Sequence, residues 1–124
     1  MTAPNFVLLY VADVPASAAF YGRLLGLEPA EASPSFAMFA LPSGLMLGLW
    51  SRTGVEPRPI GAPGQAELAC AVEADAAVQR IHGEWVAEGV PVLQAPTRMD
   101  FGFTCVAADR DGHRFRVFAP GAAS

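Results

Sequence analysis

The fold of this chain is decided by residues 6–26, which read FVLLYVADVPASAAFYGRLLG. The apolar run Phe6–Val11 predicts a buried strand. Asp13 follows it as a candidate helix N-cap, and Pro15 fits the first turn of a helix. Apolar side chains then recur at helical spacing until Gly26, which is a typical helix stop; they are Ala18, Tyr21, Leu24 and Leu25. The stretch therefore predicts a strand followed by an amphipathic helix.

Three short strands are expected after this helix, over residues 27–32, 36–41 and 45–51. The sequence Pro42-Ser43-Gly44 is typical of a turn between the last two strands. Residues 52–64 contain three prolines and three glycines and predict a linker. The first half of the chain therefore predicts the order β-α-β-β-β.

The same order begins again after the linker. A strand is expected over residues 67–72, Asp75 is a candidate helix cap, and Gly89 is a candidate stop. The helix between them carries one apolar stripe, which should pack beneath a sheet; it consists of Ala74, Ala77, Val78, Ile81 and Trp85.

Three more strands should follow, over residues 91–95, 101–107 and 113–118, with Asp111-Gly112 as a tight turn. The chain is thus interpreted as one supersecondary unit used twice. We expect a single domain over 1–124, with module 1 at about 5–51, a linker at about 52–64 and module 2 at about 65–120.

Composition excludes several classes of protein. The chain has 124 residues, of which 52% are hydrophobic and 16% charged, unlike a disordered chain. Its net charge of −4 argues against a nucleic-acid partner. No apolar run is long enough for a membrane span, and the N-terminus does not resemble a signal peptide, so a cytoplasmic protein is expected. Cys70 and Cys105 lie in apolar runs and are expected to be buried free thiols.

Two sequence motifs carry a resemblance to a known family. The first is Tyr10-Val11-Ala12-Asp13, followed by Ser17, Phe20-Tyr21 and Leu25-Gly26-Leu27; the second is Asp109-Arg110-Asp111-Gly112-His113, leading into Phe115 and Val117. With them the chain resembles the vicinal oxygen chelate superfamily from Phe6 to Pro120. That superfamily includes glyoxalases, extradiol dioxygenases, and bleomycin- and phenazine-resistance binding proteins. The stretches Leu49-Trp50-Ser51 and Asp100-Phe101-Gly102 look most like the phenazine-resistance proteins.

The resemblance implies an α+β fold of two βαβββ modules. Each module would be a curled mixed sheet with its helix on the outer face. Two chains would pair as a homodimer, so that each cup-shaped site combines modules from both chains.

The resemblance also implies where a metal would bind. Metal-using relatives place one ligand on the first strand and one on the last strand of each module. Those positions fall on Phe6, Gly48, Glu67 and Arg116, of which only Glu67 is a usable ligand. We therefore expect no metal and no cofactor, and we predict that Glu67 and Arg116 form a salt bridge with each other.

Aromatic residues provide the candidate ligand-binding surface. By strand alternation Met46, Gly48 and Trp50 share a face, Phe6, Leu8 and Tyr10 point inward from the first strand, and Met99, Phe101 and Phe103 form another stripe. The predicted binding residues are Trp50, Phe6, Tyr10, Gly48, Met46, Asp100, Phe101, Phe103, Glu67 and Arg116. Leu8, Met46 and Phe103 also fit an ordinary core, which we favour for them.

Other polar residues are better explained by structure than by catalysis. His82 fits a solvated helix face, His113 fits a turn, and Asp109 and Asp111 fit turn capping. No nucleophile motif is present. The sequence therefore favours a metal-free binding protein that sequesters a planar aromatic compound, as antibiotic-resistance proteins do. The alternatives are a diverged metal-dependent enzyme of glyoxalase or dioxygenase type, and an interaction module whose cup is filled by side chains.

Overall fold

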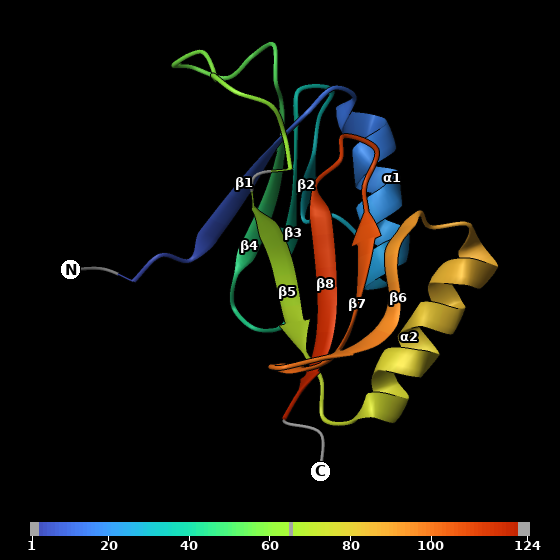
Figure 1. The fold of residues 1–124 in the computed structure, drawn as a ribbon. Helices are drawn as coiled ribbons and strands as arrows, with labels where there is room; N and C mark the ends of the chain where they lie inside the picture. The colour runs from blue at the N-terminus through green and yellow to red at the C-terminus, as the bar shows by residue number, and fades with distance from the viewer. Residues whose placement is uncertain (1–2, 65, 122–124) are drawn as a thin grey trace. The chain divides into compact units, whose positions relative to one another are not determined.

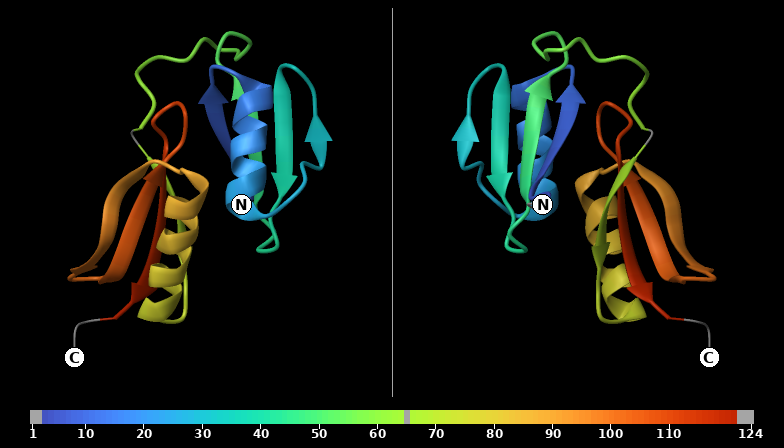
Figure 2. Two further views of the ribbon diagram at one scale, coloured as in Figure 1. Left: turned by 90° about the vertical axis from the view of Figure 1, so that its right-hand side faces the viewer. Right: turned by 90° about the vertical axis from the view of Figure 1, so that its left-hand side faces the viewer.

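The computed structural model describes residues 3–64 and 66–121. The chain divides into two compact units, the first ending at Ala62 and the second beginning at Pro63. This boundary lies within the predicted linker. In each unit one helix covers one face of a four-stranded sheet, as Figures 1 and 2 show. Neither of the helices in the described ranges is long and apolar enough to cross a membrane.

The first unit has the predicted order β-α-β-β-β. Its elements are β1 (Phe6–Val11), α1 (Val14–Leu25), β2 (Glu31–Ala32), β3 (Phe36–Ala40) and β4 (Met46–Ser51). The strands lie in the order β1-β4-β3-β2. Strand β1 runs parallel to β4, whereas the other pairs are antiparallel. The sheet is therefore mixed, as expected.

Helix α1 begins and ends where the sequence predicts. The Asp13 carboxylate accepts a hydrogen bond from the Ala16 N–H at 3.1 Å, and Gly26 closes the helix at φ 67°, a left-handed conformation that glycine adopts easily. The buried side of α1 contains Val14, Ser17, Phe20 and Tyr21. This side packs on β3 and β4.

The second unit repeats the topology of the first. Its elements are β5 (Glu67–Ala71), α2 (Asp75–Glu88), β6 (Val92–Met99), β7 (Gly102–Ala108) and β8 (Arg114–Pro120). The strand order is β5-β8-β7-β6, with β5 parallel to β8. Trp85 of α2 is buried against the sheet, as predicted, and its ring meets that of Phe115 edge-on at 6.4 Å. The expected α+β fold of two βαβββ modules is confirmed.

Several local predictions are corrected. The N-cap of α2 is Ala74, whose side chain cannot accept a hydrogen bond; Asp75 lies inside the first turn and pairs with Arg98. His82 is half-buried rather than fully solvated. Only Glu31–Ala32 of the strand predicted over 27–32 forms, because Pro29 cannot donate to a sheet ladder.

Two further corrections concern the second sheet. Strand β6 extends to Met99, past the predicted end at residue 95, and it accommodates Pro96 where its pairing register with β7 shifts. Cys70 is exposed instead of buried. It lies on the edge strand β5, whereas α2 packs on β6, β7 and β8.

The core of each unit lies between the sheet and its helix. In the first unit the fully buried side chains alternate along the strands and include Val11, Ala37, Phe39, Leu47 and Leu49. In the second unit Cys105, Ala107 and Val117 serve the same purpose beneath Val78 and Trp85. We call the opposite face of each sheet its open face. Strand alternation places the candidate site residues of β1, β4, β5 and β8 there, whereas Phe103 of β7 lies on the helix side.

Candidate ligand-binding site

The open face of the first sheet is apolar. Phe6, Leu8 and Tyr10 are 40–43% exposed along β1. Their partners in the parallel register are Met46, Gly48 and Trp50 on β4, and Phe36 on β3 lies opposite Trp50. Because paired residues share a face of the sheet, these side chains form one continuous surface.

A groove lies in this surface. It encloses about 500 Å³ and is lined by Phe6, Leu8, Phe36 and Trp50. Tyr10 stands beside it, with its ring edge-on to the Trp50 ring at 6.3 Å and 80°. Edge-on packing leaves the face of one ring free of the other, and an apolar groove with aromatic walls suits a flat apolar ligand.

Gly48 shapes the groove without lining it. A Cβ atom at Gly48 would lie 2.6 Å from Leu8 Cδ2 and 3.1 Å from two atoms of the Phe36 ring. Leu8 and Phe36 therefore occupy the space that a larger residue on β4 would take. The predicted face of Gly48 is correct, but the residue is buried beneath these two side chains. Met46 is half-buried on the same face and does not line the groove.

Glu67 and Arg116 meet on the open face of the second sheet, which confirms the predicted salt bridge. Arg116 Nε lies 2.6 Å from Glu67 Oε1, and Arg116 Nη2 lies 3.4 Å from Glu67 Oε2. This two-pronged contact is the geometry that a planar guanidinium offers a carboxylate. The side chains are 18% exposed for Arg116 and 32% for Glu67, so water reaches the pair.

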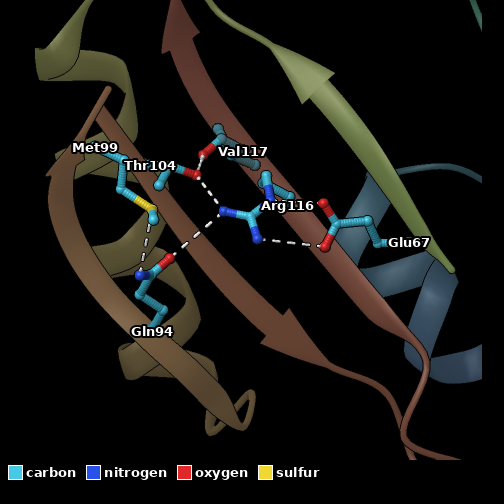
Figure 3. A network of polar contacts seen from close by, with 6 residues as sticks. All are labelled: Glu67, Gln94, Met99, Thr104, Arg116 and Val117. Carbon is cyan, nitrogen blue, oxygen red and sulfur yellow. Dashed lines mark hydrogen bonds and ion pairs between the residues drawn. The ribbon is translucent and has the colours of Figure 1, made fainter. Parts of the chain in front are cut away.

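Arg116 also organises the polar residues around it (Figure 3). Its Nη1 donates to Thr104 Oγ1 at 3.2 Å and to Gln94 Oε1 at 3.5 Å. The Thr104 hydroxyl in turn donates to the Val117 carbonyl at 2.9 Å. Thr104 is fully buried, and its hydroxyl has both a donor and an acceptor as partners. Among the described residues of this network, every buried side-chain polar atom therefore has a hydrogen-bond partner.

The predicted site residues in and after the turn that follows β6 do not all lie on the same face of the sheet. Phe101 is exposed in that turn, lies edge-on to Phe118 at 6.0 Å, and receives the Arg116 guanidinium 5.6 Å above its ring. Phe103 instead packs under Arg98, 5.1 Å from its ring centre, and Arg98 pairs with Asp75 of α2. Phe103 therefore lies on the helix side, because the turn interrupts the alternation assumed for Met99, Phe101 and Phe103. Asp100 is exposed in the same turn.

Sequence reasoning missed three residues of these faces. Phe36 lines the groove, and its position opposite Trp50 follows from the hairpin around Pro42-Ser43-Gly44. Gln94 and Thr104 complete the Arg116 network. The one available signal was that each is the single polar residue in a predicted strand, Gln94 in 91–95 and Thr104 in 101–107.

The four positions at which the resemblance implies metal ligands do not suit a divalent ion in this chain. Phe6 has no donor atom, Gly48 is covered by Leu8 and Phe36, and Glu67 is held by the Arg116 cation. A permanent positive charge at the fourth position opposes a cation there. Within residues 3–64 and 66–121, no three His, Cys, Asp or Glu side chains are grouped as metal ligands would be.

The remaining candidates have structural explanations. Asp109 Oδ1 accepts hydrogen bonds from the backbone N–H groups of Asp111 at 2.9 Å and His113 at 2.8 Å, which confirms its turn-capping role. Cys105 is buried against α2, and burial raises its pKa to about 11 despite the opposing effect of the Arg116 charge. Such a thiol is protonated at neutral pH and is a poor nucleophile.

Comparison with known proteins agrees with the resemblance seen in the sequence. Residues 3–117 match the family model of the Glyoxalase/Bleomycin resistance protein/Dioxygenase superfamily. The phenazine antibiotic resistance protein EhpR of Enterobacter agglomerans is 28% identical over 117 residues, covering 92% of this chain and 89% of that protein.

Solved structures share the architecture. The solution structure of protein ATC0852 from Agrobacterium tumefaciens is 50% identical, with a TM-score of 0.89, and the match covers 98% of this chain and 100% of that one. A glyoxalase-related enzyme from Fulvimarina pelagi is 22% identical with a TM-score of 0.83, covering 100% and 99%. The second likeness shows a shared fold.

Proposed function

We propose that this chain, which belongs to the glyoxalase/bleomycin resistance protein/dioxygenase superfamily, is a metal-free binding protein that sequesters a planar aromatic small molecule. The observation that carries the proposal is the apolar groove lined by Phe6, Leu8, Phe36 and Trp50. An open groove with ring walls can hold a flat compound by stacking and by removing apolar surface from water. The role would be protective, like antibiotic resistance by stoichiometric binding.

The chemistry of the site residues supports binding over catalysis. Glu67 is held in an ion pair, the Asp109 carboxylate caps a turn, and the Cys105 thiol has a raised pKa. The likeness to a phenazine antibiotic resistance protein points in the same direction. Sequestration needs no group poised for proton transfer or nucleophilic attack, because the bound compound is removed without being changed.

We further propose that the protein acts as a cytoplasmic homodimer, with no nucleic-acid or membrane partner. Cys70 and Cys105 are both free thiols, as is usual in a reducing compartment. The binding residues on the second sheet would be Phe101, Asp100, Glu67 and Arg116.

Fluorescence titration tests the proposed function. Trp50 is half-buried beside the groove, whereas Trp85 is buried in the core. A Trp85→Phe background therefore leaves Trp50 as the single reporter. Titration with a panel of planar tricyclic compounds, including phenazine, should quench Trp50 emission with one equivalent per chain. A panel that produced no quenching would contradict the proposal.

Trp50→Ala should weaken binding of a quenching compound roughly 5- to 150-fold, as expected for an aromatic hot spot worth about 1–3 kcal/mol. Calorimetry measures this change, because the variant lacks its fluorescent reporter. The control is Val86→Ala on the exposed surface of α2, which should leave affinity unchanged. Equal affinities for Trp50→Ala and the parent would show that Trp50 has only a structural role.

Metal analysis of the purified protein separates this function from its alternative, a diverged glyoxalase- or dioxygenase-like enzyme. The binding protein should contain no stoichiometric Zn, Ni, Mn or Fe. One equivalent of any of these metals, retained after dialysis, would favour the enzyme.

A further inference from the structure

The direction of the hydrogen bonds around Arg116 is fixed by chemistry. An arginine side chain has five N–H donors and no acceptor. The Gln94 oxygen must therefore face Arg116 Nη1, to which it lies at 3.5 Å. The Thr104 hydroxyl donates its single hydrogen to the Val117 carbonyl. Its oxygen therefore acts as the acceptor for Arg116. Every bond in the network runs outward from the guanidinium.

The Gln94 amide consequently directs its NH2 group away from Arg116 (Figure 3). This NH2 group contacts the sulfur of Met99, with Gln94 Nε2 lying 3.6 Å from Met99 Sδ. A thioether sulfur is a weak acceptor, and Met99 is 39% exposed. The Gln94 NH2 group therefore donates to a weak acceptor. An oxygen atom in place of the Met99 sulfur would accept a stronger hydrogen bond.

Charge and shape restrict the kind of ligand group that can bind beside Gln94 and Arg116. Glu67 neutralises Arg116, so an anion gains little from net charge at this face. Phe101 provides an exposed ring beside the same guanidinium, 5.6 Å from Arg116 Cζ. A neutral carbonyl oxygen attached to an aromatic ring matches both features, since the ring can pack near Phe101 while the oxygen accepts from Gln94.

We infer that Gln94 is a specificity-determining residue on the open face of the second sheet, oriented by Arg116 to donate a hydrogen bond to a neutral carbonyl oxygen of an aromatic compound bound at that face. This inference rests on the proposed function, because it names a group which that compound must carry. Arg116 is a positioning residue here, and Met99 is the partner that the ligand oxygen displaces.

Phenazine and phenazine-1-carboxamide form a suitable pair of probes, because both are neutral and only the second carries a carbonyl. Calorimetry on the full chain should give the carboxamide about a three- to tenfold lower Kd, the usual net value of one hydrogen bond. Gln94→Glu removes the NH2 donor and keeps the shape, so it should abolish the preference. Gln79→Glu makes the same chemical change on the exposed surface of α2 and should keep the preference.

The possible results distinguish failure of the Gln94 inference from failure of the proposed function. Parent protein that binds phenazine with no carboxamide preference, or Gln94→Glu protein that retains the preference, would overturn the inference and leave the proposed function standing. Failure of the parent to bind either probe would overturn both. Met99→Leu gives an independent check, because it removes the competing sulfur. The preference should persist or grow in this variant, and its loss would assign the contact to Met99 and overturn the role of Gln94.

Discussion

Arg116 illustrates how one residue can satisfy a half-buried environment. Its guanidinium contacts a carboxylate, a hydroxyl, an amide and a ring, so both its charge and its N–H groups have partners. Taking a charge out of water is costly unless it is paired. The pair is nevertheless partly wet, and its contribution to stability should be smaller than that of a fully buried pair.

A double-mutant cycle measures that contribution. Glu67→Gln, Arg116→Met and the double variant should give a coupling free energy of about 1 kcal/mol in urea unfolding, because water screens the ion pair. The Arg80–Glu84 pair on α2 is a matched control, with side chains 67% and 63% exposed, and its coupling should be about 0.3 kcal/mol. Coupling above about 3 kcal/mol would indicate that the Glu67–Arg116 pair is dry in solution.

The two cysteines should differ in reactivity. Cys70 is exposed, whereas Cys105 is buried with its pKa raised to about 11 from an ordinary 9.0. At pH 8 a thiol reagent should modify one thiol per folded chain, identified by mass spectrometry as Cys70, and both thiols after denaturation. Modification of Cys105 in the folded chain at the rate seen in urea would contradict this.

The same pKa shift predicts a dependence of stability on pH. Above about pH 9 the unfolded chain loses the Cys105 proton while the folded chain keeps it, so the free energy of unfolding should fall between about pH 9 and pH 11. Cys105→Ala should flatten this fall in urea unfolding.

At the scale of the elements, the two helices differ mainly at their N-termini. Asp13 caps α1 through its side chain. Ala74 holds the N-cap position of α2 at φ −150° and ψ 157°, an extended conformation suited to a capping residue, but it supplies no acceptor. The first-turn N–H groups of α2 therefore lack the side-chain acceptor that Asp13 provides to α1.

Removing the capping side chain of α1 and adding one to α2 should change the free energy of unfolding in opposite directions. Asp13→Ala should lower the free energy of unfolding by about 1 kcal/mol, and Ala74→Ser should raise it by a similar amount. Urea unfolding followed by circular dichroism gives both values. A destabilising Ala74→Ser would mean that a hydroxyl at this position cannot reach the first-turn N–H groups.

At the scale of the whole molecule, each sheet exposes an edge. In the described parts of the chain, β1 pairs with β4 alone and β5 pairs with β8 alone, so one side of each strand has no strand partner. Phe6, Leu8 and Tyr10 add exposed apolar surface on β1. Such edges and patches favour association with another chain.

We therefore propose a homodimer, which is the commonest closed oligomer. Light scattering at micromolar concentration should return about twice the chain mass of 13.0 kDa. Leu8→Glu places a charge on the exposed face of β1 and should shift the mass toward the monomer, while Val86→Glu on α2 should not. A parent protein that measured 13.0 kDa would contradict the proposal.

The sequence alone determined what depends on local pattern. Strand and helix order, the Asp13 cap, the Gly26 and Gly89 stops, and the Asp109 turn all follow from neighbouring residues and are confirmed. The Glu67–Arg116 pair was also predictable, because the family resemblance implies that both residues occupy converging metal-ligand positions, where opposite charges attract.

Tertiary structure alone decided the features that depend on how elements pack. Leu8 and Phe36 cover Gly48 because β4 pairs with β1, whose Leu8 is 40 residues away in the chain, and with β3, whose Phe36 is 12 residues away. Cys70 is exposed because α2 packs on the other three strands, and Phe103 lies on the helix side because a turn resets the alternation. Local residue patterns do not record which strand a helix covers or where a turn changes the face. The orientation of the Gln94 amide likewise required the position of Arg116, a neighbour supplied by another strand.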